Sequence, residues 1–122
     1  MAKNAIARHP KVLKTPTSIK NMLQLSIDEA GDRAAYKYRT SDGIREVSYK
    51  QFKEETLWLG TGLNSIGMAR GHIACVGENS YNWILTYLTA LQSEGVFCPI
   101  DKELPESDLI NNIVHGDDDI VF

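Results

Sequence analysis

The residues that could carry chemistry in this chain are few, and their spacing matches no metal-binding motif. His9, His72 and His115 do not have the spacing of metal ligands to one another or to either cysteine, so we predict surface or loop histidines. The acidic run 117–119 could bind a cation. It lacks the glycine and downstream glutamate of a calcium loop, and we interpret it as a solvated turn. The sequence therefore assigns no metal ligand.

Motifs for nucleotide binding and nucleophilic catalysis are equally incomplete. The stretch 60–62, Gly-Thr-Gly, resembles the start of a dinucleotide fingerprint, but Ser65 occupies the third glycine position and no strand precedes it. We interpret both glycines as sites of close helix packing. Ser80 and Ser93 have no positioned base that would activate a hydroxyl. We predict no catalytic and no cofactor-binding residue in this chain.

Composition and charge argue against a nucleic-acid or membrane-spanning protein. The formal net charge is −3, whereas a nucleic-acid footprint needs clustered Lys and Arg. Aromatic residues at positions 81, 83 and 87 could stack on bases, but among so many Leu and Ile we expect them in the core. No run of about 18 apolar residues is present to span a bilayer. Basic residues near the N-terminus are dispersed, which favours a solvated arm over a site for an anionic partner: Lys3, Arg8, Lys11, Lys14 and Lys20.

The two cysteines indicate a reducing compartment. Cys75 and Cys98 each lie inside an apolar, strand-like run, and the first residues lack the apolar core of a secretory signal. Thiols in this setting are typical of buried small hydrophobes rather than of a disulfide framework. We expect a cytoplasmic location.

The elements that would position these residues begin after an N-terminal arm, predicted to be extended over 1–16. Apolar residues at helical spacing predict a helix from position 17 or 18 to Gly31. Two alternating runs around Asp42-Gly43 predict a β-hairpin. Ser48 and Gln51 have the spacing of a capping box, which predicts the start of a helix that ends at Gly67.

The last 50 residues predict a parallel sheet. Short continuous apolar runs at 72–76, 96–100 and 119–122 alternate with helical patterns at 81–93 and 105–115. Continuous rather than alternating strands in a β-α-β-α-β order indicate an α/β fold, with a parallel sheet covered on both faces and right-handed crossovers. Pro99 removes one ladder donor, so we expect it near the end of its strand.

The predicted sheet raises two further questions. A buried parallel strand at 119–122 would need a neighbour on each edge, so we expect a fragment of a larger domain, with a minimal free-standing domain as the alternative. An open edge would favour dimerisation. Ligands of open α/β sheets bind at the carboxyl ends of strands, which here are the polar loops 77–79 and 101–103. These loops either face a ligand or are simply the turns that the fold requires.

A family resemblance rests on several pieces in a fixed order. The chain contains, in sequence, Val-Ser-Tyr-Lys-Gln-Phe (47–52), Leu-Gly-Thr-Gly-Leu (59–63), Gly-Met-Ala-Arg-Gly-His-Ile-Ala (67–74), Glu-Asn-Ser-Tyr-Asn-Trp (78–83), Leu-Thr-Ala-Leu (88–91), Gly-Val (95–96), Pro-Ile-Asp (99–101), Leu-Pro-Glu (104–106) and Asp-Ile-Val-Phe (119–122). This order, from about Ile19 to Phe122, resembles the beginning of the AMP-binding family of adenylate-forming enzymes. It is most similar to bacterial long-chain fatty-acid–CoA ligases. His72 departs from the family, which usually has Asp there.

The resemblance implies a fold and an activity for a longer parent protein. Residues 17–122 would form an incomplete N-terminal part of a large AMP-binding domain. The parent would use ATP, Mg²⁺ and coenzyme A to convert a carboxylic acid into an acyl-adenylate and then a thioester. The family's phosphate loop, adenine and ribose contacts and catalytic lysine lie downstream of this segment, so the chain alone is expected to be inactive. Activation of an amino or aryl acid, or a stand-alone α/β binding module without catalysis, remain alternatives.

Overall fold

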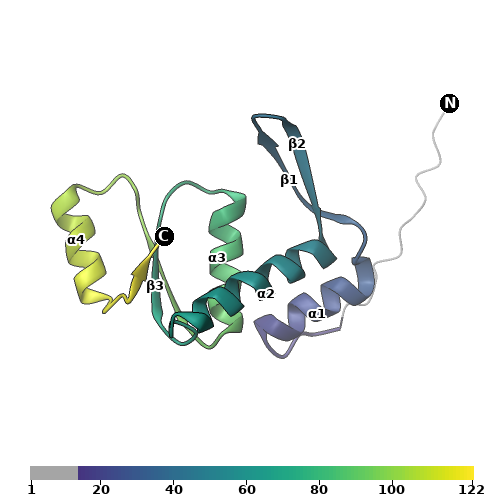
Figure 1. The fold of residues 1–122 in the computed structure, drawn as a ribbon, viewed down its shortest axis with the longest axis horizontal. Coiled ribbons are helices and arrows are strands. Elements are labelled where there is room, and N and C mark those ends of the chain that lie inside the picture. Colours follow the sequence, from purple (N-terminus) through teal and green to yellow (C-terminus); the bar gives the residue numbers. More distant parts are fainter. Residues whose placement is uncertain (1–13) are drawn as a thin grey trace.

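The computed structural model describes residues 14–122 (Figure 1). The predicted arm at 1–16 lies almost entirely outside this range, together with His9 and most of the dispersed basic residues. The elements follow the predicted order: α1 (Ile19–Ala30), β1 (Ala34–Thr40), β2 (Gly43–Ser48), α2 (Tyr49–Ser65), β3 (His72–Val76), α3 (Tyr81–Gln92), β4 (Val96–Ile100), α4 (Glu106–His115) and β5 (Ile120–Val121).

Local sequence signals set most of these boundaries. The Ser48 hydroxyl accepts from the backbone N–H of Gln51 while the Gln51 side chain accepts from the Ser48 N–H, which completes the predicted capping box of α2. Gly43 and Gly67 have φ angles of 130° and 77°, a region that favours glycine, at the hairpin turn and just after α2. The predicted hairpin forms, with β1 antiparallel to β2.

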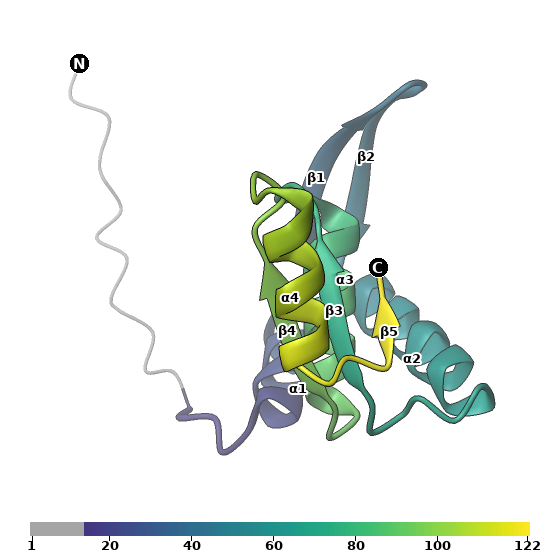
Figure 2. The same ribbon diagram turned by 90° about the vertical axis from the view of Figure 1, so that its left-hand side faces the viewer.

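The second sheet is parallel, with the strand order β4-β3-β5. The chain therefore moves from β3 to one neighbour and then crosses back to the other. Helices α3 and α4 lie on opposite faces of this sheet, as both views show (Figures 1 and 2). The predicted α/β fold, with a parallel sheet preceded by a helix and a hairpin, is confirmed. Strand β5 is shorter than the predicted 119–122, although the Phe122 N–H still donates to the Ala74 carbonyl.

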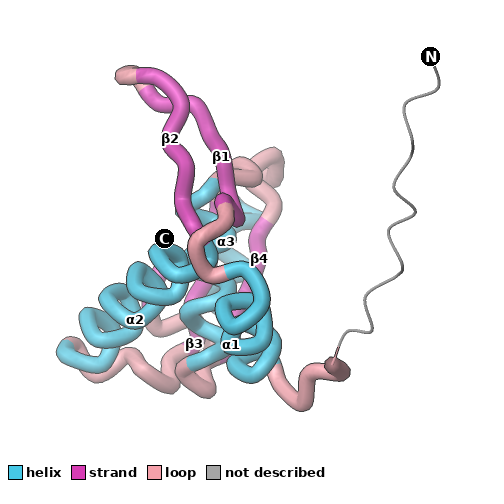
Figure 3. The backbone as a smooth tube through the Cα atoms, turned by 90° about the vertical axis from the view of Figure 1, so that its right-hand side faces the viewer, coloured by secondary structure: helices cyan, strands magenta, loops and turns pink. Residues whose placement is uncertain are grey.

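Two clusters of buried side chains hold the elements together. One joins α1, the hairpin, α2 and α3, and its buried members are Leu23, Val47, Phe52, Tyr81 and Leu88. The other joins the end of α2 to β3 and α3 through Leu63, Ile73 and Ala90. Helix α4 contains no buried residue. The hairpin projects beyond the helices that support its base (Figure 3).

The prediction of close packing at two glycines of α2 is wrong for Gly62. A Cβ atom at Gly60 would meet Ser93 Oγ at 3.6 Å and the Thr89 methyl carbon at 3.7 Å, which is ordinary van der Waals contact with α3. A Cβ atom at Gly62 would meet nothing within 4 Å. The helix face that carries Gly62 is open rather than tightly packed, so packing does not offset the low helix propensity of this glycine.

Candidate functional site

The candidate site is a hollow at the carboxyl ends of β3 and β4. Val76 and Ile100 pair at the ends of these parallel strands, so the loops that follow lie side by side. The loop after β3 leads to α3 on one face of the sheet, and the loop after β4 leads to α4 on the other (Figure 2). Ligand crevices of open α/β sheets form where two neighbouring loops diverge in this way. The loop 77–79, the last two residues of β4, the loop residues 101 and 102, and Trp83 line a hollow of about 410 Å³.

A single ion pair joins the two loops across this hollow. The Lys102 ammonium group donates to the Glu78 carboxylate and also lies 3.4 Å from a Glu103 carboxylate oxygen. The hydrogen bond from Lys102 lowers the pKa of Glu78, and the same bond raises the pKa of Lys102. Asp101 supports the loop by accepting from the Glu103 N–H at 2.9 Å. Both charged side chains are exposed, so the pair positions the loops more than it stabilises the fold.

The charged groups that line this hollow, Glu78, Asp101 and Lys102, can make polar contacts. Glu78 and Lys102 neutralise each other in part. The N-terminal end of α3 is capped by its own Ser80, whose hydroxyl accepts from the Trp83 N–H at 3.2 Å. The structure thus brings together the two loops that the sequence singled out, and it leaves both earlier interpretations, ligand-facing loop and simple turn, in place.

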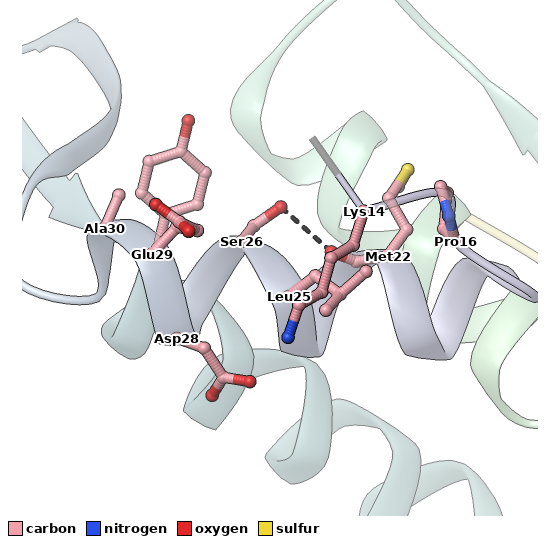
Figure 4. Close-up of a pocket in the computed structure, with 9 residues that line it drawn as sticks. Lys14, Pro16, Met22, Leu25, Ser26, Asp28, Glu29 and Ala30 are labelled. Atoms are coloured by element: carbon pink, nitrogen blue, oxygen red, sulfur yellow. Dashed lines mark hydrogen bonds between the residues drawn. The ribbon is translucent and has the colours of Figure 1, made fainter. Parts of the chain in front are cut away.

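A second hollow, which the sequence did not single out, lies beside α1 (Figure 4). Its volume is about 500 Å³, and its lining includes Met22, Leu25, Ala30 and Tyr49. The one hydrogen bond drawn in Figure 4 joins the Ser26 hydroxyl to the Met22 carbonyl at 2.9 Å, so this hydroxyl is engaged by its own helix.

The interpretation of His72 as a surface or loop residue is wrong. His72 is the first residue of β3, is half-buried, and its Nδ1 atom lies 2.7 Å from the Gly116 carbonyl oxygen. The His72 N–H donates to the Asp119 carboxylate at 2.8 Å, and the Asp119 N–H donates back to the His72 carbonyl at 2.8 Å. His72 therefore ties the start of β3 to the turn that precedes β5.

The solvated acidic turn predicted at 117–119 is also wrong in part. Both carboxylate oxygens of Asp118 are buried, and the weak thiol donor of Cys98 is their one nearby partner among the described residues. The side chain lies against Gly116, where a Cβ atom would come within 2.7 Å of Asp118 Oδ2. Asp117, beside it, is exposed and has a φ angle of 49°. The turn is thus folded inward at its centre and solvated at its start.

Both cysteines are free and lie in strands, as predicted. Cys75 is buried, and burial raises the pKa of its thiol. Burial, followed by the nearby Asp118 carboxylate, raises the pKa of the Cys98 thiol to about 11. Neither thiol is activated, since a reactive cysteine needs a lowered pKa. Among residues 14–122, no group of three or more His, Cys, Asp or Glu side chains is arranged to hold a metal ion.

An ionic and aromatic cluster at the base of the hairpin was missed by sequence reasoning. Glu55 accepts from Arg45 at 2.5 Å and from the Tyr81 hydroxyl at 2.8 Å. The Arg45 guanidinium lies 5.7 Å from the Tyr38 ring centre and 5.6 Å from the Tyr81 ring centre. Burial, together with the bond to Glu55, raises the pKa of Tyr81. The cluster joins the hairpin, α2 and α3. The one hint of it in the sequence was the prediction that Tyr81 is a core aromatic residue.

Comparison with known proteins identifies the family. The sequence profile of the family described as "AMP-binding enzyme" matches residues 23–122. The parallel sheet, hairpin and helices described above agree with this match. The chain belongs to the AMP-binding enzyme family.

Individual relatives are much longer than this chain. It is 27% identical over 81 residues to the long-chain-fatty-acid–CoA ligase ACSBG2 of Xenopus laevis, an alignment that covers 66% of this chain and 11% of the ligase. The crystal structure of IdnL1 matches with a TM-score of 0.78 and 15% identity, covering 88% of this chain and 22% of that one. The structure of VinN with L-aspartate matches with a TM-score of 0.75 and 18% identity, covering 89% and 30%. The two structural matches establish the fold alone.

Proposed function

We propose that this chain is the N-terminal structural part of an ATP-dependent acyl-CoA ligase. The observation that carries the proposal is the similarity to a long-chain-fatty-acid–CoA ligase over 81 residues, within a chain that belongs to the AMP-binding enzyme family. No described helix combines the length and apolar character needed to cross a membrane. We propose a cytoplasmic location for the parent, in keeping with two free, unactivated thiols.

The reaction proposed for the parent takes place in two steps. A fatty-acid carboxylate oxygen attacks the α-phosphorus of Mg²⁺-bound ATP, pyrophosphate leaves, and an acyl-adenylate forms. The thiol of coenzyme A then attacks the acyl carbon and AMP leaves. ATP, Mg²⁺ and coenzyme A are therefore the proposed cofactors and co-substrate of the parent. None of the 122 residues is assigned a catalytic or binding role in either step.

The proposed role of this segment is to support the rest of the parent polypeptide, its principal partner. The 122-residue chain alone is expected to release neither AMP nor pyrophosphate. We also propose that its exposed sheet edge can pair with another copy of the chain.

Activation of an amino or aryl acid is the second candidate. Its support is the structural match to VinN with L-aspartate, although at 18% identity this match concerns the fold. A third candidate, a stand-alone module that binds a nucleotide or a protein without catalysis, rests on the polar hollow at the strand ends.

The test reads the gene past the codon for Phe122 and expresses the full open frame. AMP and pyrophosphate release are then measured with ATP and Mg²⁺, using palmitate, L-aspartate or benzoate, each with and without coenzyme A. We expect palmitate-dependent AMP release and formation of a coenzyme A thioester. Dependence on aspartate or benzoate instead would favour the second candidate. A natural stop codon after Phe122, or no turnover with any acid, would overturn the ligase proposal.

A further inference from the structure

A single carboxylate on α2 contacts both the hairpin and the start of α3. The Arg45 guanidinium of β2 donates to Glu55 Oε1 at 2.5 Å, and the Tyr81 hydroxyl of α3 donates to Glu55 Oε2 at 2.8 Å. The Glu55 side chain is only 18% exposed, and Tyr81 is 7% exposed. Each carboxylate oxygen of Glu55 is therefore engaged by a different element.

Ring stacking gives this contact a defined geometry. The Tyr38 ring of β1 stacks on the Tyr81 ring, with ring centres 4.9 Å apart and an angle of 11° between the planes. Arg45 donates to the Tyr38 hydroxyl at 2.7 Å, and its guanidinium lies close enough to both ring centres for cation–π contacts. The hairpin thus meets the first residue of α3 through a ring stack and through the shared carboxylate of Glu55.

Tyr81 lies at the point where the loop after β3 becomes a helix. It is the first residue of α3, and both the loop 77–79 before it and Trp83 after it line the hollow at the strand ends. The Trp83 N–H donates to the Ser80 hydroxyl and the Ile84 N–H donates to the Ser80 carbonyl, each at 3.2 Å. A first helical turn has few backbone hydrogen bonds of its own, so its position depends on what holds its side chains.

We propose that Glu55 is a positioning residue through which the hairpin holds the first turn of α3, and with it Trp83 and the loop 77–79, in place beside the hollow. The route runs from Arg45 through Glu55 to Tyr81, without a gap in the hydrogen bonds. Contiguous hydrogen bonds and packed rings of this kind carry coupling between residues that are far apart in the sequence. A displaced hairpin therefore alters the wall of the hollow, although the residues that line it all lie outside the hairpin.

A contact that only stabilised the fold would behave differently. The Arg45 side chain is 49% exposed, so its ion pair with Glu55 adds little stability by itself. A loss of stability raises the unfolded fraction, but unfolded molecules remain rare in a protein of ordinary stability, and the folded molecules keep the same environment around Trp83. A positioning role predicts that this environment changes in the folded state itself.

The experiment measures acrylamide quenching of Trp83 fluorescence in the 122-residue chain. The sequence has two tryptophans, and Trp58 is 70% exposed on α2, so Trp58→Phe leaves Trp83 as the reporter of the hollow. In this background we expect Glu55→Gln to raise the quenching constant about twofold, because the first turn of α3 opens more often. Arg45→Met, which keeps the packing but removes the charge, should raise it less. Lys37→Gln, which breaks the exposed ion pair of the hairpin, is the matched control and should leave it unchanged.

Two further variants separate positioning from stability. Ile73→Val shortens a side chain that is 1% exposed in the other buried cluster, so it lowers stability without touching Glu55, and Trp83 quenching should stay unchanged. Tyr81→Phe keeps the ring and removes the hydroxyl that binds Glu55. We expect Tyr81→Phe to raise Trp83 quenching and Arg45→Met to add nothing further in that variant, because both changes interrupt the same route.

Several results would overturn the proposal. These are unchanged Trp83 quenching in folded Glu55→Gln and Arg45→Met variants, an equal rise in Lys37→Gln or Ile73→Val, and an effect of Arg45→Met that is as large without the Tyr81 hydroxyl as with it. Circular dichroism confirms that each variant is folded. If Glu55→Gln does not fold, Arg45→Met and Tyr81→Phe decide the matter, since each removes one partner of the carboxylate. None of these results bears on the ligase proposal, which is tested by turnover.

Discussion

The base of the hairpin and the α4–β5 end of the sheet differ in how far their side chains are buried and in whether their buried polar atoms have hydrogen-bond partners. At the hairpin base, Val47, Phe52 and Tyr81 are buried, and the polar atoms among them have partners. At the other end, α4 has no buried residue, and Asp118 has a buried carboxylate whose one nearby donor among the described residues is the Cys98 thiol. The first region is complete within the chain. In the second region, which we call the incomplete region, the helix buries none of its side chains.

The largest expected effect lies in the complete region. Phe52→Ala removes a ring that is 2% exposed and contacts the Tyr36 and Tyr81 rings, so we expect a loss of about 3–5 kcal/mol in the free energy of unfolding. Urea denaturation followed by circular dichroism measures it. The matched control is Trp58→Ala on the same helix, where 70% exposure limits the change to about 0.5 kcal/mol. Equal effects for the two variants would contradict the comparison.

A second effect concerns the ionic cluster at the hairpin base. Glu55→Gln removes the charge that binds both Arg45 and Tyr81, and we expect a loss of about 1–2 kcal/mol. Because the pKa of Tyr81 is raised in the folded state, stability should be full below pH 10 and fall as the pH rises above it. Denaturation at pH 7 and pH 11 checks both statements. Glu54→Gln, at an exposed position of the same helix, is the control. It should change neither the free energy of unfolding at pH 7 nor its decrease at pH 11.

The incomplete region should respond in the opposite direction. Asp118→Asn replaces a buried carboxylate, whose one nearby donor is the weak Cys98 thiol, with a neutral group of the same shape, so we expect a gain of about 1 kcal/mol in the free energy of unfolding. Asp117→Asn, at the adjacent exposed position, should be neutral because Asn tolerates a positive φ angle. A destabilised Asp118→Asn variant would show that the carboxylate has a partner in solution and would remove this contrast.

The smallest effect is expected at the strand-end hollow. Lys102→Gln breaks an exposed ion pair that positions two loops, and stability should change by less than about 0.5 kcal/mol. Lys37→Gln, in the exposed pair with Glu46, is the matched control. A loss above about 1 kcal/mol at Lys102 alone would mean that the hollow is part of the folded core rather than an open crevice.

The sequence predicted the elements well because their signals are local. The capping-box spacing of Ser48 and Gln51 predicts the start of α2, and Gly43 and Gly67 occupy turns that need positive φ angles. The order β4-β3-β5 is a property of long-range pairing, and the residue pattern predicted a parallel sheet without its order. The crevice could be located because strand ends are visible in the sequence. Its ion pair between Glu78 and Lys102, 24 residues apart, could not.

The errors also share a physical cause. The inward position of Asp118 and the half-buried His72 both depend on the contact between the start of β3 and the turn before β5, 47 residues later. Charged residues in a short acidic run are usually solvated, so composition favoured the wrong interpretation of this turn. The resemblance to ligases came from the order of many weak motifs. Membership of the AMP-binding enzyme family, which this order predicted, is confirmed by the family match over residues 23–122.

Hydrogen exchange of the 122-residue chain, followed by mass spectrometry at neutral pH and low micromolar concentration, tests the contrast between the two regions most directly. Amide protection reports the free energy of local opening, which depends on burial and packing. We predict slow exchange in α2 and α3 and exchange at least 100-fold faster in α4 and β5. Equal protection of α4–β5 and α2–α3 in this monomeric sample would contradict the account.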